Sequence, residues 1–285
     1  MKTVIGLGEV LWDMLPAGRQ LGGAPSNFAY HVSQSGCKGV VVSAVGNDDL
    51  GNDIISMLEE KKLQSCLARV DKPTGIVSVE LSEDKIPVYD IKRDVAWDYI
   101  PFTDELRDLA RNADAVCFGT LAQRGPVSRK TIRSFISSMP VDSLKVFDIN
   151  LRGDFYDAQT IMESLLLSNI LKINDEEIVT VGNLFGYETN ELPEIATRLL
   201  VEYKLQNVIL TCGAHGSYVF GKDEVLFQPT PKVEVVDTVG AGDTFTAVFV
   251  ASLLQGKPLS EAHSDAVRRS AYICTKPGAM HPYDE

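Results

Sequence analysis

The chain has 285 residues, enough for one large α/β domain or two smaller ones, and its 45% hydrophobic content is ordinary for a globular protein with a substantial core. Its 27 Lys and Arg against 39 Asp and Glu give a formal net charge of −12. This argues against nucleic acid partners, because phosphate-backbone binding needs clustered basic residues. Five widely spaced cysteines predict buried thiols in a reducing compartment, and no apolar run reaches membrane-spanning length. We therefore expect a cytoplasmic protein without a membrane partner.

Strand-like apolar runs alternate with helical patterns along most of the chain. Residues 4–7 precede a helix from Pro25, and residues 39–45 precede a helix over about 51–62. Such short apolar runs are typical of strands buried on both faces of a sheet. We therefore predict a mostly parallel sheet covered by helices, in one continuous domain. Four further strands are expected after residue 100, at 115–119, 145–149, 170–173 and 208–212.

One region departs from this alternation. Residues 74–82 and 86–92 alternate apolar and polar side chains around Glu83-Asp84-Lys85, a pattern that predicts an antiparallel hairpin with one solvated face. The hairpin is either an edge element without a further role or a lid over a cleft. We favour the lid, because closing flaps commonly exclude water from transfer reactions.

The segment before Pro25 combines small residues with polar side chains. Gly22 and Gly23 allow a ligand to approach the backbone closely, and Asn27 offers both a donor and an acceptor to a polyol. Asp13 follows the first strand, where ligands of open α/β sheets bind. Alternatively, Asn27 is a helix-start residue and Asp13 a turn former.

Two further segments follow predicted strands. Asn174 to Glu177 forms a polar cluster that either holds a hydrated Mg²⁺ or caps a helix. Thr211, Gly213 and Gly216 belong to a glycine loop that either contacts a nucleotide or makes a plain turn. Near the N-terminus, Gly6 and Gly8 superficially begin a dinucleotide-binding fingerprint, but Leu11 occupies the third glycine position, so we discount a nicotinamide cofactor.

The most informative segment is Gly240-Ala241-Gly242-Asp243, at the start of an apolar helix. Small residues let the backbone approach an anion, and the helix N-terminus offers unpaired N–H groups and its positive dipole end. Asp243 would stand where a substrate hydroxyl meets a phosphate. A tight strand-to-helix connection with an ordinary first-turn acid is the alternative. In either case, the helix dipole is expected to lower the pKa of Asp243.

The helix after Asp243 can be delimited from its pattern. Phe245, Val248, Phe249 and Leu253 recur at spacings of three and four, which predicts one buried stripe. Gly256 and Pro258 then terminate the helix.

Five elements in this order resemble the ribokinase-like carbohydrate kinases of the phosphofructokinase-B type, and among them fructokinases. The resemblance covers nearly the whole chain, from Gly8 and Glu9 to residues 276–279, and the last of the five elements is highly specific for the family. The elements are residues 22–27, residues 46–51, residues 148–152, Asn174 with Glu177, and residues 237–243.

The resemblance implies a Rossmann-like three-layer sandwich over residues 1–285. A small β lid would come mainly from about 74–100, with part of 12–22. It also implies transfer of the γ-phosphate of ATP to a primary hydroxyl of a small sugar, with fructose as the first choice. Asp243 would be the base, in an anion hole made by Gly240, Ala241 and Gly242.

The remaining roles also follow from the resemblance. Sugar contacts would come from Asp13, Gly22, Gly23, Asn27 and Arg93. ATP and Mg²⁺ contacts would come from Asn174, Glu177 (through water), Thr211, Gly213, Gly216 and Arg152. Potassium would bind backbone carbonyls of Asp237, Val239 and Gly278, and a homodimer would form through the lid.

Two departures from the family pattern bear on the substrate. Ile149 stands where fructokinase-like members usually carry Pro, and Ser26 where relatives often have Ala. Both weaken the choice of fructose more than the choice of a kinase. Ketodeoxygluconate, ribose, phosphosugar and nucleoside kinases stay open, with Arg93 and Arg152 as candidates for a second phosphate, as does a sugar-sensing protein without turnover.

Overall fold

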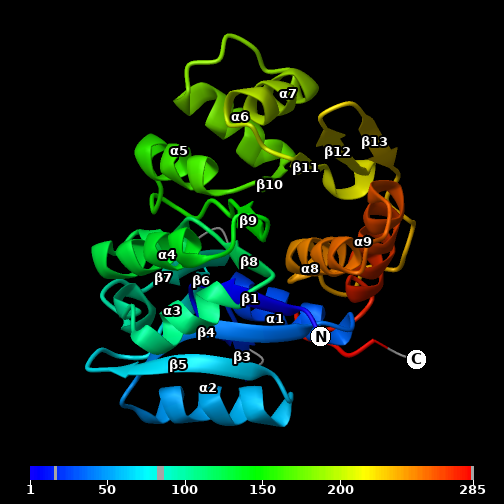
Figure 1. Ribbon diagram of the computed structural model, residues 1–285. Coiled ribbons are helices and arrows are strands. Elements are labelled where there is room, and N and C mark those ends of the chain that lie inside the picture. Colours follow the sequence, from blue (N-terminus) through cyan, green and yellow to red (C-terminus); the bar gives the residue numbers. More distant parts are fainter. Residues whose placement is uncertain (16–17, 82–86, 284–285) are drawn as a thin grey trace.

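A computed structural model describes residues 1–15, 18–81 and 87–283, and it shows two sheets of unequal size (Figure 1). The larger, nine-stranded sheet has the order β13-β12-β11-β10-β9-β8-β1-β4-β5. Neighbouring strands from β11 to β5 are parallel, while β12 and β13 form an antiparallel edge. In chain order the strands are β1 (Thr3–Leu7), β4 (Lys38–Gly46), β5 (Gln64–Val70), β8 (Ala115–Phe118), β9 (Leu144–Asp148), β10 (Ile170–Asn174), β11 (Asn207–Thr211), β12 (Ser217–Gly221) and β13 (Val225–Gln228).

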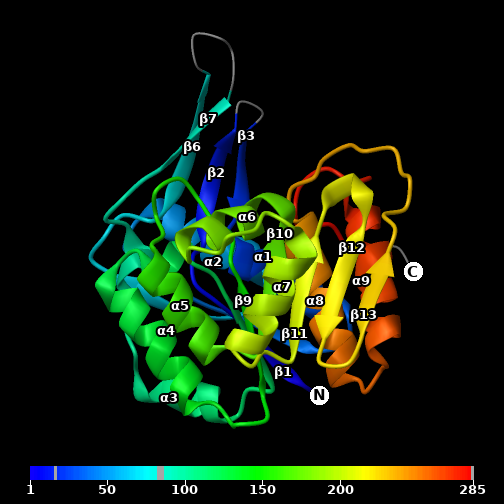
Figure 2. The ribbon, with the colours of Figure 1, turned by 90° about the horizontal axis from the view of Figure 1, so that it is seen from above.

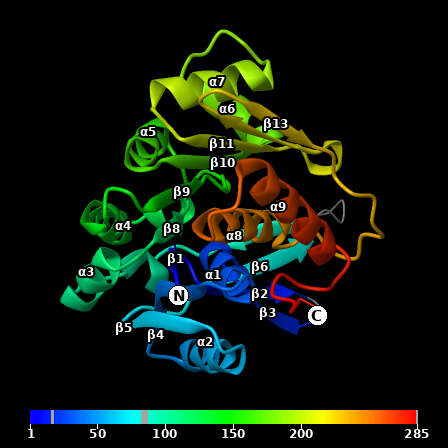
Figure 3. The ribbon, with the colours of Figure 1, turned by 45° about the vertical axis from the view of Figure 1, so that its right-hand side comes forward.

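Helices cover both faces of this sheet, so the expected three-layer sandwich is confirmed (Figure 3). One face packs against α1 (Ala24–Gln34), α2 (Asp49–Glu60), α8 (Ala241–Leu254) and α9 (Leu259–Ile273). The other packs against α3 (Asp104–Arg111), α4 (Pro126–Ser138), α5 (Ala158–Leu167), α6 (Asp175–Leu184) and α7 (Leu192–Glu202).

The predicted single buried stripe of α8 is wrong. Every residue from Thr244 to Ser252 is buried, because the sheet, α1 and α9 surround this helix. The helix is therefore held from several sides along most of its length. Its predicted end is confirmed, since the last helical residue, Leu254, lies just before Gly256.

The smaller sheet has the order β3-β2-β6-β7 and projects from the body of the molecule (Figure 2). Its strands are β2 (Leu11–Leu15), β3 (Gly18–Gly22), β6 (Ile76–Leu81) and β7 (Pro87–Ile91). The predicted antiparallel pairing of β6 with β7 is confirmed, and β2 pairs parallel to β6. The predicted turn around Glu83-Asp84-Lys85 lies outside the described residues. Beyond β7, the short 3₁₀ helix Ala96–Tyr99 packs into the core of the main domain.

Candidate active site

Polar side chains gather where the parallel strands of the large sheet end. Asp148 is the last residue of β9 and lies in register with Lys172 of β10. Asn174 and Thr211 end β10 and β11, and they also lie in register with each other. The carboxyl edge of the sheet therefore places these segments beside one another, where ligands of open α/β sheets bind.

The N-terminus of α8 lies at this edge without a side-chain cap. Gly240 precedes the helix in the left-handed region at φ 78°, and a Cβ there would lie 2.7 Å from the Cβ of Ala279, so both conformation and space require glycine. Among the described residues, the N–H groups of Gly242 and Asp243 have no hydrogen-bond acceptor. These free donors are therefore available to an anionic ligand.

Asp243 faces Asn27 of α1. The Asn27 side-chain amide donates a 2.8 Å hydrogen bond to Oδ2 of Asp243. The pKa of Asp243 is raised to about 6, chiefly by desolvation and next by the charge of Asp148, while Asn27, Lys172 and Arg152 act in the opposite direction. The expected lowering of this pKa is therefore wrong, because desolvation outweighs the helix dipole.

Lys172 was not among the residues predicted to form the site. Its ammonium group forms an ion pair of 3.2 Å with Asp148, and both side chains are buried. A Cβ on Gly242 would lie 3.1 Å from Nζ of Lys172, so the ammonium group lies directly against the helix start. Thr246 donates to the other oxygen of Asp148 at 2.9 Å. The one sequence signal was a lysine inside the apolar run 170–173.

The predicted sugar contacts lie in two adjoining elements. Asp13 belongs to strand β2 of the small sheet and not to a loop at the end of β1. A Cβ on Gly22 would lie 2.2 Å from Oδ2 of Asp13, so glycine at this position leaves the carboxyl group its space. Burial raises the pKa of Asp13 to about 6. Gly23 has φ 107° and adjoins the Glu9 carbonyl, which brings the end of the small sheet to the start of α1.

Asn174 and Glu177 form a capping box at the start of α6. Oδ1 of Asn174 accepts from the N–H groups of Glu176 and Glu177, and Oε2 of Glu177 accepts from the N–H of Asn174. The other carboxylate oxygen of Glu177 accepts from the Leu151 N–H at 3.0 Å. These bonds fix a buried carboxylate beside the carboxyl edge of the sheet, and each oxygen keeps a lone pair for a metal-bound water.

The predicted glycine loop connects β11 to β12, as expected. Gly213 and Gly216 both have positive φ, at 51° and 111°, and Thr230 donates to the Gly213 carbonyl at 2.6 Å. Thr211 ends β11 beside Asn174, so the loop begins next to the capping box of α6.

Asp237 joins the two segments that were predicted to bind potassium. Its Oδ1 accepts from the Val239 N–H and its Oδ2 from the Gly278 N–H, both at 3.0 Å. Within the described residues, no hydrogen bond uses the carbonyl oxygens of Asp237, Val239 or Gly278. This donor set of neutral oxygens fits a monovalent cation.

The two predicted arginines differ in their surroundings. Arg152 carries its charge close enough to lower the pKa of both Asp243 and Glu9. Arg93 is exposed, forms an ion pair of 3.0 Å with Asp154 and stacks over the ring of Phe155. Of the two, Arg152 is among the groups with the largest effects on the pKa of Asp243.

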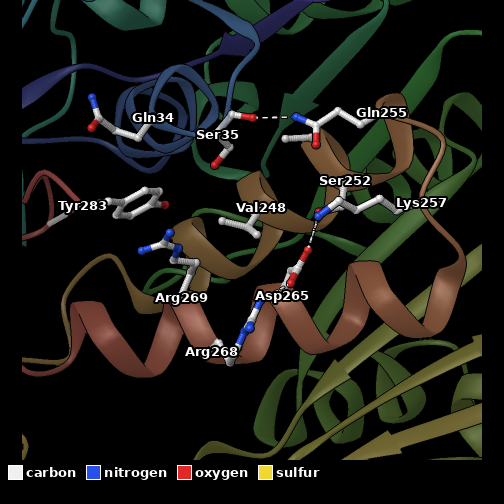
Figure 4. A pocket seen from close by; sticks show the side chains of 11 residues that line it. Gln34, Ser35, Val248, Ser252, Gln255, Lys257, Asp265, Arg268, Arg269 and Tyr283 are labelled. Carbon is white, nitrogen blue, oxygen red and sulfur yellow. Dashed lines mark hydrogen bonds and ion pairs between the residues drawn. The ribbon is translucent and has the colours of Figure 1, made fainter. Parts of the chain in front are cut away.

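A second, separate pocket of about 200 Å³ lies between α1, α8 and α9 (Figure 4). It adjoins the C-terminal half of α8, away from Asp243 at the first turn. Its charges are largely partnered within the chain, since Asp265 pairs with both Lys257 and Arg268, and Arg269 stacks over Tyr283. The carboxyl edge of the sheet is thus the better candidate for chemistry.

A free helix start with an adjoining carboxylate, at the carboxyl edge of a doubly covered parallel sheet, is an arrangement suited to phosphoryl transfer. Residues 17–285 match the model of the pfkB family carbohydrate kinases. The chain belongs to this family.

Curated and solved relatives agree with this assignment. A sugar kinase of Pyrococcus horikoshii is 29% identical over 275 residues, covering 90% of this chain and 84% of the relative. Its structure with ATP has a TM-score of 0.84, covering 98% of this chain and 94% of that one at 28% identity. An ATP-dependent 6-phosphofructokinase of Thermoanaerobacterium thermosaccharolyticum is 29% identical, and the match covers 97% of this chain and 89% of the relative. A fructokinase of Salmonella typhimurium is 26% identical, and the match covers 96% of this chain and 94% of the relative.

Proposed function

We propose that the protein transfers the γ-phosphate of ATP to a primary hydroxyl of a small sugar, with fructose as the preferred acceptor. One observation carries the proposal: the carboxyl group of Asp243 is held by Asn27 beside N–H groups of α8 that have no acceptor among the described residues. A carboxylate and an anion-binding helix start in one place supply what phosphoryl transfer needs.

In this proposal Asp243 orients the acceptor hydroxyl and takes its proton as the new P–O bond forms. A pKa of about 6 leaves the group mostly ionised at neutral pH, and therefore able to accept that proton. Phosphoryl transfer has a loose transition state with little early demand for deprotonation, so orientation and late proton capture suffice.

The free N–H groups of Gly242 and Asp243 would stabilise charge on the transferred phosphoryl group without reorganising. Lys172, fixed against Gly242 by Asp148, adds a buried positive charge to the same place. Arg152 is proposed to contact ATP, and Thr211, Gly213 and Gly216 to hold its nucleoside part.

Glu177 is the proposed anchor for Mg²⁺, through a bound water, and Asn174 holds it in place. When bound, the Mg²⁺ ion neutralises charge on the triphosphate. Potassium is proposed to bind the carbonyl oxygens of Asp237, Val239 and Gly278.

On the acceptor side, Asp13, Gly22, Gly23 and Asn27 are proposed to bind sugar hydroxyls, under a lid made by the small sheet. Arg93 is proposed to contact the acceptor only if the lid closes. The edges of the small sheet are the proposed homodimer interface. Five free cysteines fit a cytoplasmic location. In the described part of the chain, no helix is long and apolar enough to cross a membrane.

A phosphosugar or ketodeoxygluconate acceptor is the second candidate. The observation that favours it is the charge of Arg152, which acts on Asp243 and Glu9 and could pair with an anionic acceptor. Since the relatives named above include both a fructokinase and a 6-phosphofructokinase, the choice rests on experiment.

The decisive test measures ADP release with fructose, fructose 6-phosphate, ketodeoxygluconate, ribose and adenosine, each with and without K⁺. We expect the highest kcat/KM with fructose and a rise on adding K⁺. A preference for an anionic sugar would replace fructose by the second candidate. Saturable sugar binding with no ADP release from any acceptor would refute the kinase and indicate a sugar sensor.

A further inference from the structure

Glu9 is a buried carboxyl group with no role in the site described so far. It follows β1 by two residues and is 6% exposed. Its Oε2 has no hydrogen-bond partner among the described residues. An unpartnered carboxyl oxygen in a protein interior is costly and calls for an explanation.

The free oxygen of Glu9 belongs to a small group of unpartnered acceptors around Asp243. Oδ1 of Asn27 and Oδ1 of Asp148 are also buried without a hydrogen-bond donor, although Asp148 keeps its ion pair with Lys172. Glu9, Asp148 and Asp243 line one cavity of about 10 Å³. The volume is about that of one water molecule, and the three carboxyl groups are polar partners for it in a lining that is otherwise mainly apolar.

The reaction itself creates a need for a proton acceptor behind Asp243. The proton lost by the acceptor hydroxyl goes to Asp243, and a bound sugar and nucleotide would cover the open side of that carboxyl group. The cavity that Asp243 shares with Glu9 then offers a route for the proton. Burial raises the pKa of Glu9 to about 7 and that of Asp243 to about 6, so both carboxyl groups can exchange a proton near neutral pH.

We propose that Glu9 is a positioning residue that receives the reaction's proton from Asp243 through one water molecule and so restores Asp243 for the next turnover. This inference rests on the proposed phosphoryl transfer. The acceptor O–H bond breaks, the O–P bond forms and ADP leaves, while the proton passes to the Asp243 carboxylate. Asp243 then gives a proton to the water, which gives one to the Glu9 carboxylate. Neutral Glu9 releases the proton to solvent when the products leave.

The groups that face Glu9 support this role. Asp243 from the start of α8 disfavours its ionised form, whereas Arg152 and the N–H groups of Glu9 itself and of Ala24 favour it. Asp148 of β9 lines the same cavity but is already paired with the ammonium group of Lys172. Glu9 is therefore the member of the group that is free to exchange a proton near neutral pH.

The test is the pH dependence of kcat with saturating ATP and sugar in the wild type, in Glu9→Gln and in Glu9→Asp. The wild type should lose activity on the acid side through two ionisations, near 7 and near 6. Glu9→Gln should lower kcat about tenfold, which is less than the 10²- to 10⁴-fold range for a group that takes the proton from the substrate itself, and should keep only the limb near 6. Glu9→Asp should restore two limbs. Glu59→Gln, an exposed acid on α2, is the matched control.

Other outcomes separate the proposals. A raised KM for the sugar with an unchanged pH profile would make Glu9 a sugar contact and overturn the relay. Absence of turnover in the wild type would instead refute the proposed function. If Glu9→Gln does not fold, infrared difference spectra of wild type and Glu9→Asp decide the matter. A protonated carboxyl band that titrates near pH 7 and shifts in Glu9→Asp supports the relay, and its absence contradicts it.

Discussion

Two helices, α6 and α8, begin near the carboxyl edge of the same sheet with acidic residues in their first turns, and they differ in what their first N–H groups bind. In α6 the side chains of Asn174 and Glu177 satisfy the helix start. In α8 Gly240 offers no side chain, and Asp243 faces Asn27 of another helix. When the side chains of a helix bind its own first N–H groups, they stabilise the helix. When those N–H groups have no acceptor, they are available to a ligand.

The largest expected effect comes from Asp243→Asn. We expect kcat to fall about 10²- to 10⁴-fold, the range for a proton-transfer group, with ATP affinity within a few-fold of wild type. Folding raises the pKa of Asp243 to about 6, so ionisation of this carboxyl group in the folded protein lowers the free energy of unfolding, in full above about pH 6. Asp243→Asn should therefore be as stable as wild type or more stable at pH 7. ADP release measures kcat, and calorimetry measures ATP affinity and stability.

The matched control is Asp104→Asn, which removes an exposed first-turn acid from α3. Its kcat should equal that of wild type. Near-normal kcat in Asp243→Asn would end the assignment of the base.

Lys172→Met should lower the free energy of unfolding by about 3–5 kcal/mol, because it leaves the buried Asp148 without its partner. Urea unfolding measures this loss. Lys2→Met is the control, since it breaks an exposed pair with Asp114 and should cost less than about 1 kcal/mol. Equal stability of the two variants would show that the buried pair does not support the site.

Gly240→Ala and Gly256→Ala compare the two ends of α8 at nearly the same backbone angle, φ 78° and 80°. Each should cost about 1–3 kcal/mol through the left-handed conformation. Only at Gly240 does the new methyl group meet Ala279, so only there should kcat fall, by about tenfold or more, since losing one such donor costs on the order of a hundredfold. Equal kcat in both variants would contradict the role of the α8 start.

Asn174→Ala should cost about 1 kcal/mol through the lost cap of α6. It should also raise the Mg²⁺ concentration for half-maximal activity by about tenfold, because Glu177 loses its anchor. Asp157→Ala removes the cap of α5 and should cost the same stability without changing the Mg²⁺ dependence. If both variants keep wild-type Mg²⁺ dependence, Asn174 is only a cap.

The sequence predicted the parts of this comparison that local patterns determine. Apolar runs located the parallel strands, and the glycines before Asp243 located the start of α8. The sequence did not predict the direction of the pKa shift at the open start of α8. That shift depends on Asn27, Asp148 and Lys172, which are distant from Asp243 in the chain. The pKa of Asp243 was predicted to fall because only the dipole of its own helix was considered, and this direction is wrong.

Other gaps have the same physical origin. Asp13 was placed after the first strand because periodicity does not reveal that a chain leaves one sheet for another, and β2 belongs to the small sheet. Lys172 looked like an ordinary strand residue until strand register put it opposite Asp148. Glu9 marked the start of the resemblance to the family but had no predicted role, since its free oxygen is a property of the assembled cavity.

The central claim is that Asp243, beside an open helix start, takes the proton of the sugar hydroxyl. The most direct measurement is the pH dependence of kcat with saturating ATP and fructose in wild type and Asp243→Asn. We expect the acid side of the wild-type profile to contain a limb near pH 6, where Asp243 becomes protonated, beside the limb near 7 assigned to Glu9. The residual activity of the variant should lack the limb near 6. The same limb near 6 in both proteins would contradict the claim.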